Sequence, residues 1–411
     1  MLFFMACANS PVPQTTSTTE KPKEEIKQRL QMGAERFDEY LPKLKGKSVG
    51  LVANQTARVH YPKTSGNAST MDSQKGDIHL ADYLLQNGIR IKTIFSPEHG
   101  FRGKADAGAK VKDGKDPITG LPVISLYGKN RKPQKAQLEG IDIMVFDIQD
   151  VGVRYYTYIG TLHYMMEACA ENHIPLIILD RPNPNGHYVD GPILDPSYRS
   201  FVGMHEVPIV HGMTIGEYGR MINEEGWLKD GVKVDLQVVA CANYTHEMPY
   251  ALPLKPSPNL PNFRSILLYP SLCLFEGTVI SIGRGTDKQF QVIGHPDLPK
   301  GNFSFTPKPM PGALHPKLEG KLCNGLNLSE LDTKSLYKSK QINIEWLVKT
   351  YHDFPDKEHF FLKNLFFDKL AGGDVLRKQI VEGLTAKEIR DSWQDGLERF
   401  KKIRGRYLLY D

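Results

Sequence analysis

IRIKTIFSPEHGFRG, residues 89–103, passes from an apolar run to a strongly polar one within a single short stretch. Ile89–Phe95 is typical of a buried strand. The residues that follow carry a carboxylate, an imidazole and a guanidinium, on Glu98, His99 and Arg102. In open parallel sheets the ligand crevice lies beyond the carboxyl ends of the strands. The stretch therefore predicts a strand of such a sheet, followed by a loop that carries functional groups.

The same pattern recurs along the first half of the chain. Apolar runs that end in polar residues lie at Lys47–Asn54, Leu121–Gly128, Ile141–Asp150 and Ile174–Gly186. Apolar residues recur at helical spacing in His79–Gly88 and Tyr158–His173. Strands that are apolar on both faces and alternate with helices predict a mostly parallel sheet covered by helices. No G-x-G-x-x-G follows the first strand, so we expect a Rossmann-like shape without a dinucleotide site.

The composition of the chain changes after about Leu254. LKPSPNLPNFRS, residues 254–265, is rich in proline and asparagine. Such a rigid loop is either a domain boundary or a segment that lines a substrate site. Beyond it, extended proline-rich sequence gives way to amphipathic helical spacing toward the C-terminus.

The first residues resemble the end of a bacterial lipoprotein signal. MLFFMAC, residues 1–7, is apolar and ends in a cysteine, and the Ser/Thr/Pro tract after it suits a flexible tether. The segment before Cys7 is shorter than the usual apolar segment of about 7–15 residues and has no basic residue, which a start codon placed too far downstream would explain. We expect export and a lipid anchor at Cys7; the alternative is an unmodified cytoplasmic start.

Composition and motifs argue against several functions. The 411 residues, 40% hydrophobic and 24% charged, suit a globular protein of one or two domains. The net charge of +5 is spread along the chain, so we expect no nucleic-acid partner. The sequence has no CxxC pair, no HExxH and no GxSxG, and we expect no metal and no cofactor. A metal site assembled from distant residues such as His99, Asp150 and His295 stays open.

Polar residues at the predicted strand ends are the candidates for chemistry. Glu98 is either a general acid or base, or a carboxylate that pairs with Arg102 to stiffen its loop. Asp147 and Asp150 bracket a strand end, just before Arg154 and a group of tyrosines. Carboxylates and aromatic faces together suit a polar, ring-shaped ligand. The alternative is that Asp147 caps the next helix and the tyrosines pack in the core.

Two further groups of residues could likewise either bind a ligand or stabilise the fold. Asp180 follows another strand end, where it either faces the crevice or pairs with the adjacent Arg181. In FEGTVISIGRGTDK, residues 275–288, the glycines on either side of Arg284 allow a ligand to approach the backbone. The planar guanidinium of Arg284 would then suit a carboxylate.

Six motifs in one order resemble those of a known family: SPEHGFRG, FDIQDVGVRYYTYI, LDRPNPNG, PSPNLPN, FEGTVISIGRGTD and RYLLY. The chain is similar, from about Gly46 to its C-terminus, to the NamZ-type exo-β-N-acetylmuramidases of glycoside hydrolase family 171, formerly a domain-of-unknown-function family. The resemblance implies an α/β fold, with a Rossmann-like catalytic domain at residues 46–258. A smaller α+β domain, residues 259–411, would complete the active-site cleft, and residues 1–45 would be the signal remnant and tether.

The resemblance also implies an activity. Members of the family release N-acetylmuramic acid from the non-reducing end of peptidoglycan fragments, in cell-wall turnover and recycling. The expected partners are therefore peptidoglycan-derived saccharides, and the expected location is the periplasm or the cell envelope. The membrane would be contacted only through the anchor at Cys7.

By the same resemblance the family's motif glutamate falls on Glu98, the expected general acid/base, with His99 tuning it. Asp147 or Asp150 would be the second carboxylate or would hold the acetamido group, and would only orient that group if the group itself attacks. Arg284 or Arg154 would recognise the lactyl carboxylate that distinguishes muramic acid. The residues expected to bind substrate are Arg102, Arg154, Tyr156, Asp180, Asn183, Asn259, Glu276, Arg284 and Asp287.

Two other functions stay open on the sequence: a lipid-anchored protein that captures muropeptides without cutting them, and a metal-dependent hydrolase. Catalysis by Glu98 predicts that Glu98→Gln keeps ligand affinity and abolishes turnover, whereas capture predicts little change in either. A metal-dependent enzyme would lose activity to a chelator and regain it with a divalent ion.

Overall fold

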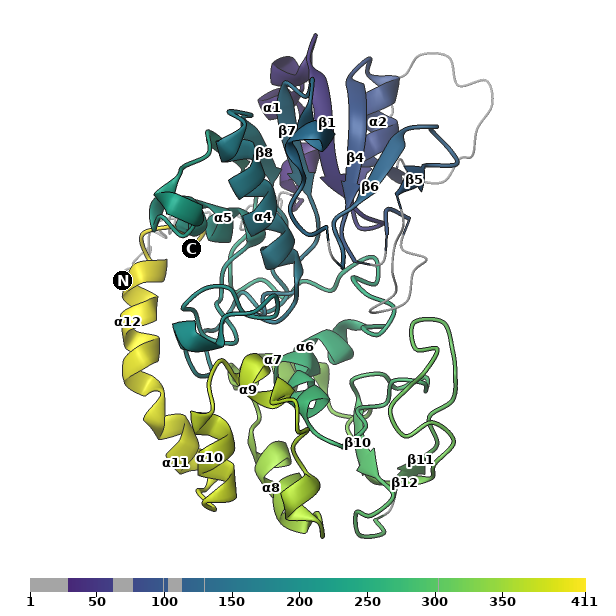
Figure 1. Cartoon of the computed structure of the whole chain (residues 1–411), viewed down its shortest axis with the longest axis vertical. Coiled ribbons are helices and arrows are strands. Elements are labelled where there is room, and N and C mark those ends of the chain that lie inside the picture. The colour runs from purple at the N-terminus through teal and green to yellow at the C-terminus, as the bar shows by residue number, and fades with distance from the viewer. Residues whose placement is uncertain (1–28, 62–76, 99, 103–112, 129, 302) are drawn as a thin grey trace, which may run out of the picture.

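The computed structural model describes residues 29–61, 77–98, 100–102, 113–128, 130–301 and 303–411. A sheet-based domain forms the upper half of the molecule in Figure 1, and a second domain rich in helices forms the lower half. Within the described residues, no helix is both long enough and apolar enough to cross a bilayer.

A seven-stranded sheet forms the centre of the first domain. Its order is β5-β6-β4-β1-β7-β8-β9, and every neighbouring pair is parallel except β5 with β6. The strands are β1 (Ser48–Ala53), β4 (Arg90–Ser96), β5 (Gly114–Lys115), β6 (Pro122–Ser125), β7 (Ile143–Asp147), β8 (Leu176–Leu179) and β9 (Leu236–Val239). β1, β7 and β8 are buried at every position, which explains why their sequences do not alternate between apolar and polar residues. The predicted α/β fold with a mostly parallel sheet is confirmed.

Helices cover both faces of this sheet. The helices are α1 (Phe37–Leu44) and α2 (Leu80–Gln86) on one face, and α3 (Lys135–Leu138), α4 (Tyr158–Glu171) and α5 (Ile215–Glu224) on the other. A hydrophobic core lies on each face of the sheet, and alternate residues of a strand point into one core or the other. Val145 packs with α1 and α2, and its neighbour Phe146 packs with α4 and α5. A short ribbon of β2 (Arg58–His60) and β3 (Asp77–His79) adjoins the sheet domain.

The order of the strands places a crevice beside Glu98. β1 is central, and the chain adds β4 on one side of it and β7 on the other. At such a reversal the loops after the strands diverge and leave an opening at their carboxyl ends. Glu98 follows β4, and the tyrosine-rich segment follows β7.

The second domain is smaller and mixed, as predicted. It begins with α6 (Phe263–Leu272) and contains an antiparallel sheet of order β10-β12-β11. These strands are β10 (Val292–His295), β11 (Phe303–Phe305) and β12 (Cys323–Asn327). The helices that follow are α7 (Thr333–Ser339), α8 (Glu345–Asp353), α9 (Phe366–Ala371), α10 (Val375–Val381), α11 (Ala386–Ser392) and α12 (Gln394–Arg404).

The final helix leads the chain back to the first domain (Figure 1). At its end Arg404 donates from Nε to the carbonyl oxygen of Gly212, at 2.9 Å. The hydroxyl of Tyr410 then donates to the buried carboxylate of Asp180, at 2.6 Å. The two domains are therefore joined at the start of the second domain and again at its end.

Candidate active site

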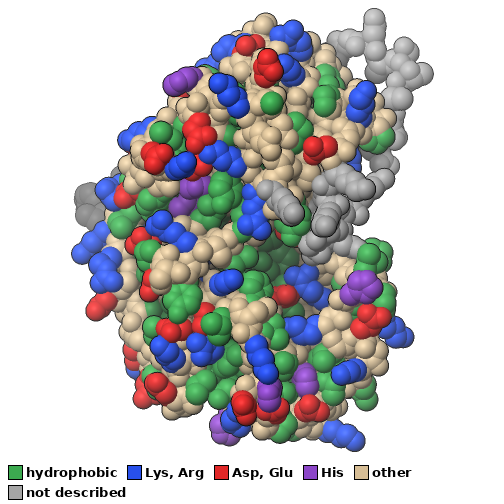
Figure 2. Space-filling model, viewed as in Figure 1, with side chains coloured by type: hydrophobic (Ala, Val, Ile, Leu, Met, Phe, Trp, Pro, Cys, Tyr) green, Lys and Arg blue, Asp and Glu red, His purple; other side chains and the backbone are tan. Residues whose placement is uncertain are grey.

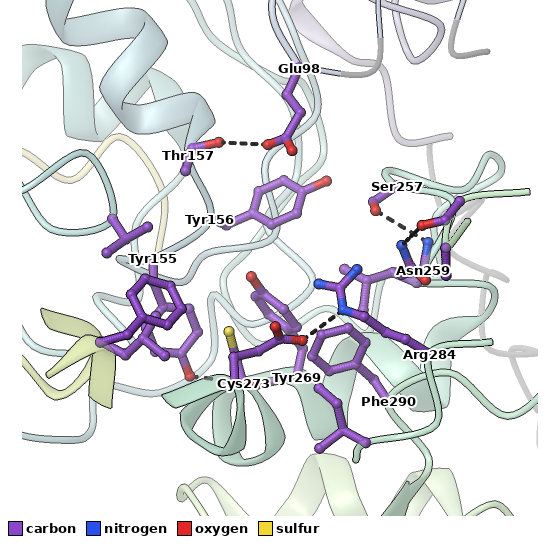
Figure 3. Close-up of a pocket in the computed structure, with 18 of the residues that line it drawn as sticks. Glu98, Tyr155, Tyr156, Thr157, Ser257, Asn259, Tyr269, Cys273, Arg284 and Phe290 are labelled. Carbon is purple, nitrogen blue, oxygen red and sulfur yellow. Dashed lines mark hydrogen bonds and ion pairs between the residues drawn. The ribbon is translucent and has the colours of Figure 1, made fainter. Parts of the chain in front are cut away.

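A cavity of about 1060 Å³ lies between the two domains, beyond the carboxyl ends of the parallel strands. Figure 2 shows the hollow between the two halves of the molecule, and Figure 3 shows the side chains inside it. This volume is slightly above the usual range for small-molecule sites, about 300–1,000 Å³. Both domains contribute to the wall, so the site exists only when they are together.

Glu98 lies on the wall that the first domain supplies. It follows β4 and Pro97, and its Oε2 accepts a hydrogen bond from the hydroxyl of Thr157, at 3.4 Å (Figure 3). The hydroxyl of Tyr127 also hydrogen-bonds to Glu98. Burial, with the negative charge of Glu98, raises the pKa of Tyr127 to about 12. The Tyr127 hydroxyl therefore stays protonated and donates the hydrogen bond to Glu98. The predicted catalytic carboxylate therefore lies in the cavity, held by two hydroxyl groups.

Four aromatic rings form one side of the cavity. Tyr156 packs edge-to-face on Tyr158 and Tyr269, with ring centroids 4.9 and 5.8 Å away, and Tyr155 packs in the same way on Tyr269. Burial raises the pKa of each of these tyrosines. Tyr156 lies below Glu98 in Figure 3; its hydroxyl is buried, and a hydrogen bond with Tyr158 contributes to its raised pKa. A flat aromatic wall of this kind suits a sugar ring.

The second domain contributes an ion pair. Arg284 donates from Nε to Oε1 of Glu276 at 2.7 Å, and its guanidinium lies 5.1 Å from the ring centroid of Phe290. In Figure 3 the dashed line from Arg284 starts at Nε, and the two terminal nitrogens lie on the other side of the guanidinium, toward the cavity. Burial opposes the charge on Glu276, but Arg284 and Lys317 outweigh it and hold the pKa of Glu276 below its usual value. Arg284 is therefore fixed at one end and able to bind an anion at the other.

Gly283 and Gly285, on either side of Arg284, are required by the local backbone. Both have positive φ angles, 82° and 81°. A side chain on Gly283 would place Cβ 2.5 Å from the carbonyl oxygen of Lys288. Only glycine fits such a position without strain.

A half-buried lysine, Lys317, ties the loop of residues 312–317 to this wall. The ammonium of Lys317 donates to the carbonyl oxygens of Phe275, Glu276, Thr278 and Ile280. Burial lowers its pKa, since four carbonyl dipoles replace water only in part. Lys317 thus acts as a structural cation within the cavity wall.

Asn259 is the other predicted residue that the cavity includes. It lies in the proline-rich loop, where its side-chain amide donates to the carbonyl oxygen of Gly312 at 2.8 Å. The predicted residues that line the cavity are therefore Glu98, Tyr156, Asn259, Glu276 and Arg284.

Asp147 is buried beneath the cavity and does not line it. Its two carboxylate oxygens accept hydrogen bonds from Arg181, which is buried as well. Burial raises the pKa of Asp147 and the charge of Arg181 opposes that rise. The pair satisfies both charges inside the domain, so the geometry favours a structural role for Asp147.

Asp150 lies one layer behind the tyrosines. Its Oδ2 accepts from the backbone amide of Gly152 at 2.6 Å, and its Oδ1 is buried without a hydrogen-bond partner among the described residues. Burial raises its pKa to about 7, and its charge in turn adds to the high pKa of Tyr156. Asp150 is outside the cavity wall but close enough to influence it.

Both terminal nitrogens of Arg154 are engaged with the backbone, and its Nε is buried without a hydrogen-bond partner among the described residues. Its Nη1 donates to the carbonyl oxygens of Pro192 and Val207 in the first domain, and its Nη2 to those of Leu370 and Ala371 in α9. Burial lowers its pKa to about 10. The structure therefore does not place Arg154 where a substrate carboxylate binds; it fastens the two domains together.

The remaining predicted residues that the structure describes also lie away from the cavity. Arg102 pairs with Asp82 and Asp116, the latter at 2.8 Å, which stiffens its own loop. Asp180 accepts hydrogen bonds from Thr214, Gly216 and Tyr410. Asn183 donates to the carbonyl oxygen of Met213 in the interior, Asp287 is exposed on the surface, and His99 lies outside the described residues.

Other cavity residues were not predicted. Tyr127 and Arg131 follow the β6 strand end, so the rule that located Glu98 applied to them as well. No sequence signal pointed to Lys317. The other residue proposed for a metal site, His295, packs on Phe354 and does not line the cavity. No cluster of three His, Cys, Asp or Glu side chains suited to a metal ion occurs in the part of the chain that the structure describes.

Comparison with known proteins gives matches over nearly the whole chain. Residues 49–264 match the family model described as exo-β-N-acetylmuramidase NamZ, N-terminal, and residues 267–410 match the corresponding C-terminal model. The peptidoglycan β-N-acetylmuramidase NamZ of Bacillus subtilis (strain 168) is 38% identical over 434 aligned residues, which cover 100% of this chain and 97% of that protein.

Two solved structures are similar to this one, both of DUF1343 family proteins from Bacteroides fragilis NCTC 9343. The first is 46% identical with a TM-score of 0.83, and the second is 27% identical with a TM-score of 0.74. Each comparison covers 93% of this chain and 99% of the other. The arrangement of the two domains is thus shared across the full length of these proteins.

Proposed function

Because this chain belongs to the NamZ exo-β-N-acetylmuramidase family, we infer that it is a glycosidase that releases N-acetylmuramic acid from the non-reducing end of peptidoglycan fragments. The enzyme therefore acts in peptidoglycan turnover. The observation that carries the inference is Glu98, held by Thr157 and Tyr127 in a two-domain cavity with Arg284 in the wall.

Glu98 acts as the general acid and base in this proposal. Glycosidic cleavage requires a proton at the leaving oxygen as the bond from the sugar breaks. The carboxyl group of Glu98 supplies that proton, and the carboxylate left behind then takes a proton from the attacking water. Thr157 and Tyr127 fix its orientation through the hydrogen bonds that they donate.

Arg284 binds the lactyl carboxylate of muramic acid. Its terminal N–H groups point into the cavity while Nε is held by Glu276, so that the guanidinium is already oriented before substrate arrives. A planar guanidinium can bind a carboxylate through two parallel hydrogen bonds. N-acetylglucosamine lacks this carboxylate and would leave the terminal N–H groups of Arg284 without an acceptor.

The buried groups behind the cavity support the chemistry indirectly. Tyr156 offers its ring to the sugar, and the negative charge of Asp150 acts on its buried hydroxyl. We assign Asp150 to the positioning of Tyr156, and Asp147 to the internal pair with Arg181. Tyr156 is thus the group that meets the substrate, and the two aspartates act through their neighbours.

The direct test is the release of N-acetylmuramic acid from a chromogenic muramic acid glycoside. We expect turnover by the wild type, with and without a chelator, and none by Glu98→Gln, which should still bind the ligand. Glu247→Gln is a matched control, since Glu247 forms an exposed ion pair with Lys340 on the surface. If the wild type bound the glycoside without hydrolysing it, the protein would be a capture protein and not an enzyme.

We also propose that the protein is exported and anchored in the cell envelope by a lipid on Cys7. The support is the sequence alone: an apolar start, a cysteine and a Ser/Thr/Pro tract. Residues 1–28 lie outside the described residues. Metabolic labelling with a radioactive fatty acid should label the wild type and not Cys7→Ser; equal labelling of both would contradict the anchor.

A further inference from the structure

Among the described residues, four cationic side chains line the cavity, and two of them are already engaged with the protein. Arg284 is paired with Glu276, and Lys317 is surrounded by four carbonyl oxygens. Lys369, on α9, is exposed and therefore hydrated. Arg131 differs from all three in its environment.

The guanidinium of Arg131 lies against an aromatic ring. Its Cζ is 4.1 Å from the ring centroid of Phe201, and Phe201 in turn stacks on Tyr164 of α4 with ring centroids 6.3 Å apart. The stacking fixes the plane of the guanidinium and leaves its edge for hydrogen bonds in that plane. This arrangement prepares Arg131 to bind a carboxylate.

Arg131 also forms no ion pair in the part of the chain that the structure describes. Its Nε is buried without a hydrogen-bond partner there, and no described carboxylate pairs with it. Arg131 is half-buried on the cavity wall, so an anion that enters the cavity can reach its side chain. Such an anion would give Arg131 the ion pair that it lacks among the described residues.

The position of Arg131 indicates which part of the substrate it meets. Its positive charge acts on Tyr127, the residue that hydrogen-bonds to Glu98, whereas Arg284 belongs to the wall from the second domain. Glu98 must stand at the leaving oxygen to protonate it. If Arg284 holds the released sugar, Arg131 lies on the side of the leaving group.

We propose that Arg131, stacked on Phe201, forms a second anion-binding subsite that takes a carboxylate on the leaving part of the substrate. The proposal rests on the function inferred above. Two sources share this chemistry: the lactyl carboxylate of the next muramic acid, since muramic acid alternates with N-acetylglucosamine along the glycan, and a carboxylate of a peptide stem attached to it.

The test compares three substrates: the disaccharide MurNAc-GlcNAc, the trisaccharide MurNAc-GlcNAc-MurNAc, and the trisaccharide with a peptide stem on its last sugar. In Arg131→Gln we expect kcat/KM to fall about tenfold for a substrate with the second carboxylate, and to stay unchanged for the disaccharide. A loss on the bare trisaccharide assigns the lactyl carboxylate, and a loss confined to the stem-bearing one assigns the stem. Arg131→Lys keeps the charge without the planar fork and should recover only part of the rate.

Arg199→Gln is the matched control. Arg199 is exposed and belongs to the same domain, and its replacement by Gln removes the same charge. The wild-type preference for the longer substrates should also shrink as ionic strength rises. An equal loss on all three substrates, or no loss on either trisaccharide, would overturn the proposal. Absence of turnover by the wild type on every substrate would instead refute the proposed function, so the two failures are distinct.

Discussion

Asp150 keeps a carboxyl group in the interior with only one of its oxygens hydrogen-bonded by the described residues. Burial raises its pKa from 3.8 to about 7, so the folded protein binds a proton at pH values where the unfolded chain has lost it. Its contribution to stability is complete below about pH 4 and is lost as the pH rises through 7. Asp150→Asn removes this dependence.

The melting temperature should therefore respond to pH differently in the two proteins. Between pH 5 and pH 8 the wild type should lose more stability than Asp150→Asn, and the variant should be the more stable one at pH 8. Differential scanning calorimetry at both pH values measures the difference. Parallel pH dependences would show that Asp150 is not buried as a neutral acid.

Arg284 gives a second prediction at the level of one side chain. Replacing Arg284 by Gln removes the planar donor and should lower kcat/KM for a muramic acid glycoside by roughly tenfold to a hundredfold, the range for hydrogen bonds to charged groups. Selectivity over the corresponding N-acetylglucosamine glycoside should fall by the same factor. The ratio of the two kcat/KM values is the measurement.

The single change also leaves the half-buried Glu276 without its ion-pair partner. The double variant Glu276→Gln/Arg284→Gln is therefore the control, since it removes both charges. Selectivity should be lost in both variants, while the double variant should be the more stable. Retained selectivity in the double variant would place the lactyl carboxylate elsewhere.

Between elements, Arg154 fastens α9 to the loops of the first domain through four carbonyl oxygens. Removing it leaves buried acceptors unsatisfied, and we expect Arg154→Leu to lower the free energy of unfolding by about 2–4 kcal/mol. Arg154→Lys should not restore it, because one ammonium group cannot reach both pairs of carbonyls. Urea denaturation measures both, and a KM change without a stability change would favour substrate binding instead.

The elements themselves could be predicted from the sequence to a large extent. Runs such as Ile141–Asp150 showed a buried parallel strand because both faces are apolar, and the strand-end rule led to Glu98. The same rule could not separate Glu98 from Asp147, since both follow strands and only their partners differ. Arg181 neutralises Asp147 from 34 residues away, a pairing that only the packed structure reveals.

Residues from the second domain were harder to predict for the same reason. Arg284 stood out because glycines flank it, and the structure brings it to the cavity. Lys317 had no local signal, since its four acceptors lie 37 to 42 residues earlier in the chain. Arg154 appeared available in the sequence because its partners are backbone carbonyls, which any residue provides.

Across the whole molecule, the C-terminus completes the first domain. The hydroxyl of Tyr410 donates to Asp180 and accepts from the backbone amide of Cys241, at 2.6 and 2.7 Å. Burial raises the pKa of Asp180 to about 6, and the hydrogen bond from Tyr410 opposes that rise. Tyr410→Phe should therefore cost about 1–3 kcal/mol of unfolding free energy at pH 8.

This cost should shrink as the pH falls below 6, because a protonated Asp180 depends less on the donor. Chemical denaturation at pH 8 and pH 5 tests the prediction. Tyr61→Phe is a suitable control, since the ring of Tyr61 is 37% exposed. An equal cost at both pH values would mean that Tyr410 acts through packing alone.

The return of α12 to the sheet domain has a consequence for the order in which the protein is made. Asp180 is synthesised 230 residues before its partner Tyr410. While the ribosome is still translating the second domain, the buried carboxyl of Asp180 can accept hydrogen bonds from Thr214 and Gly216, but Tyr410 does not yet exist. A nascent chain that stops before Tyr410 would therefore leave this interior carboxyl with fewer donors than it has in the folded protein.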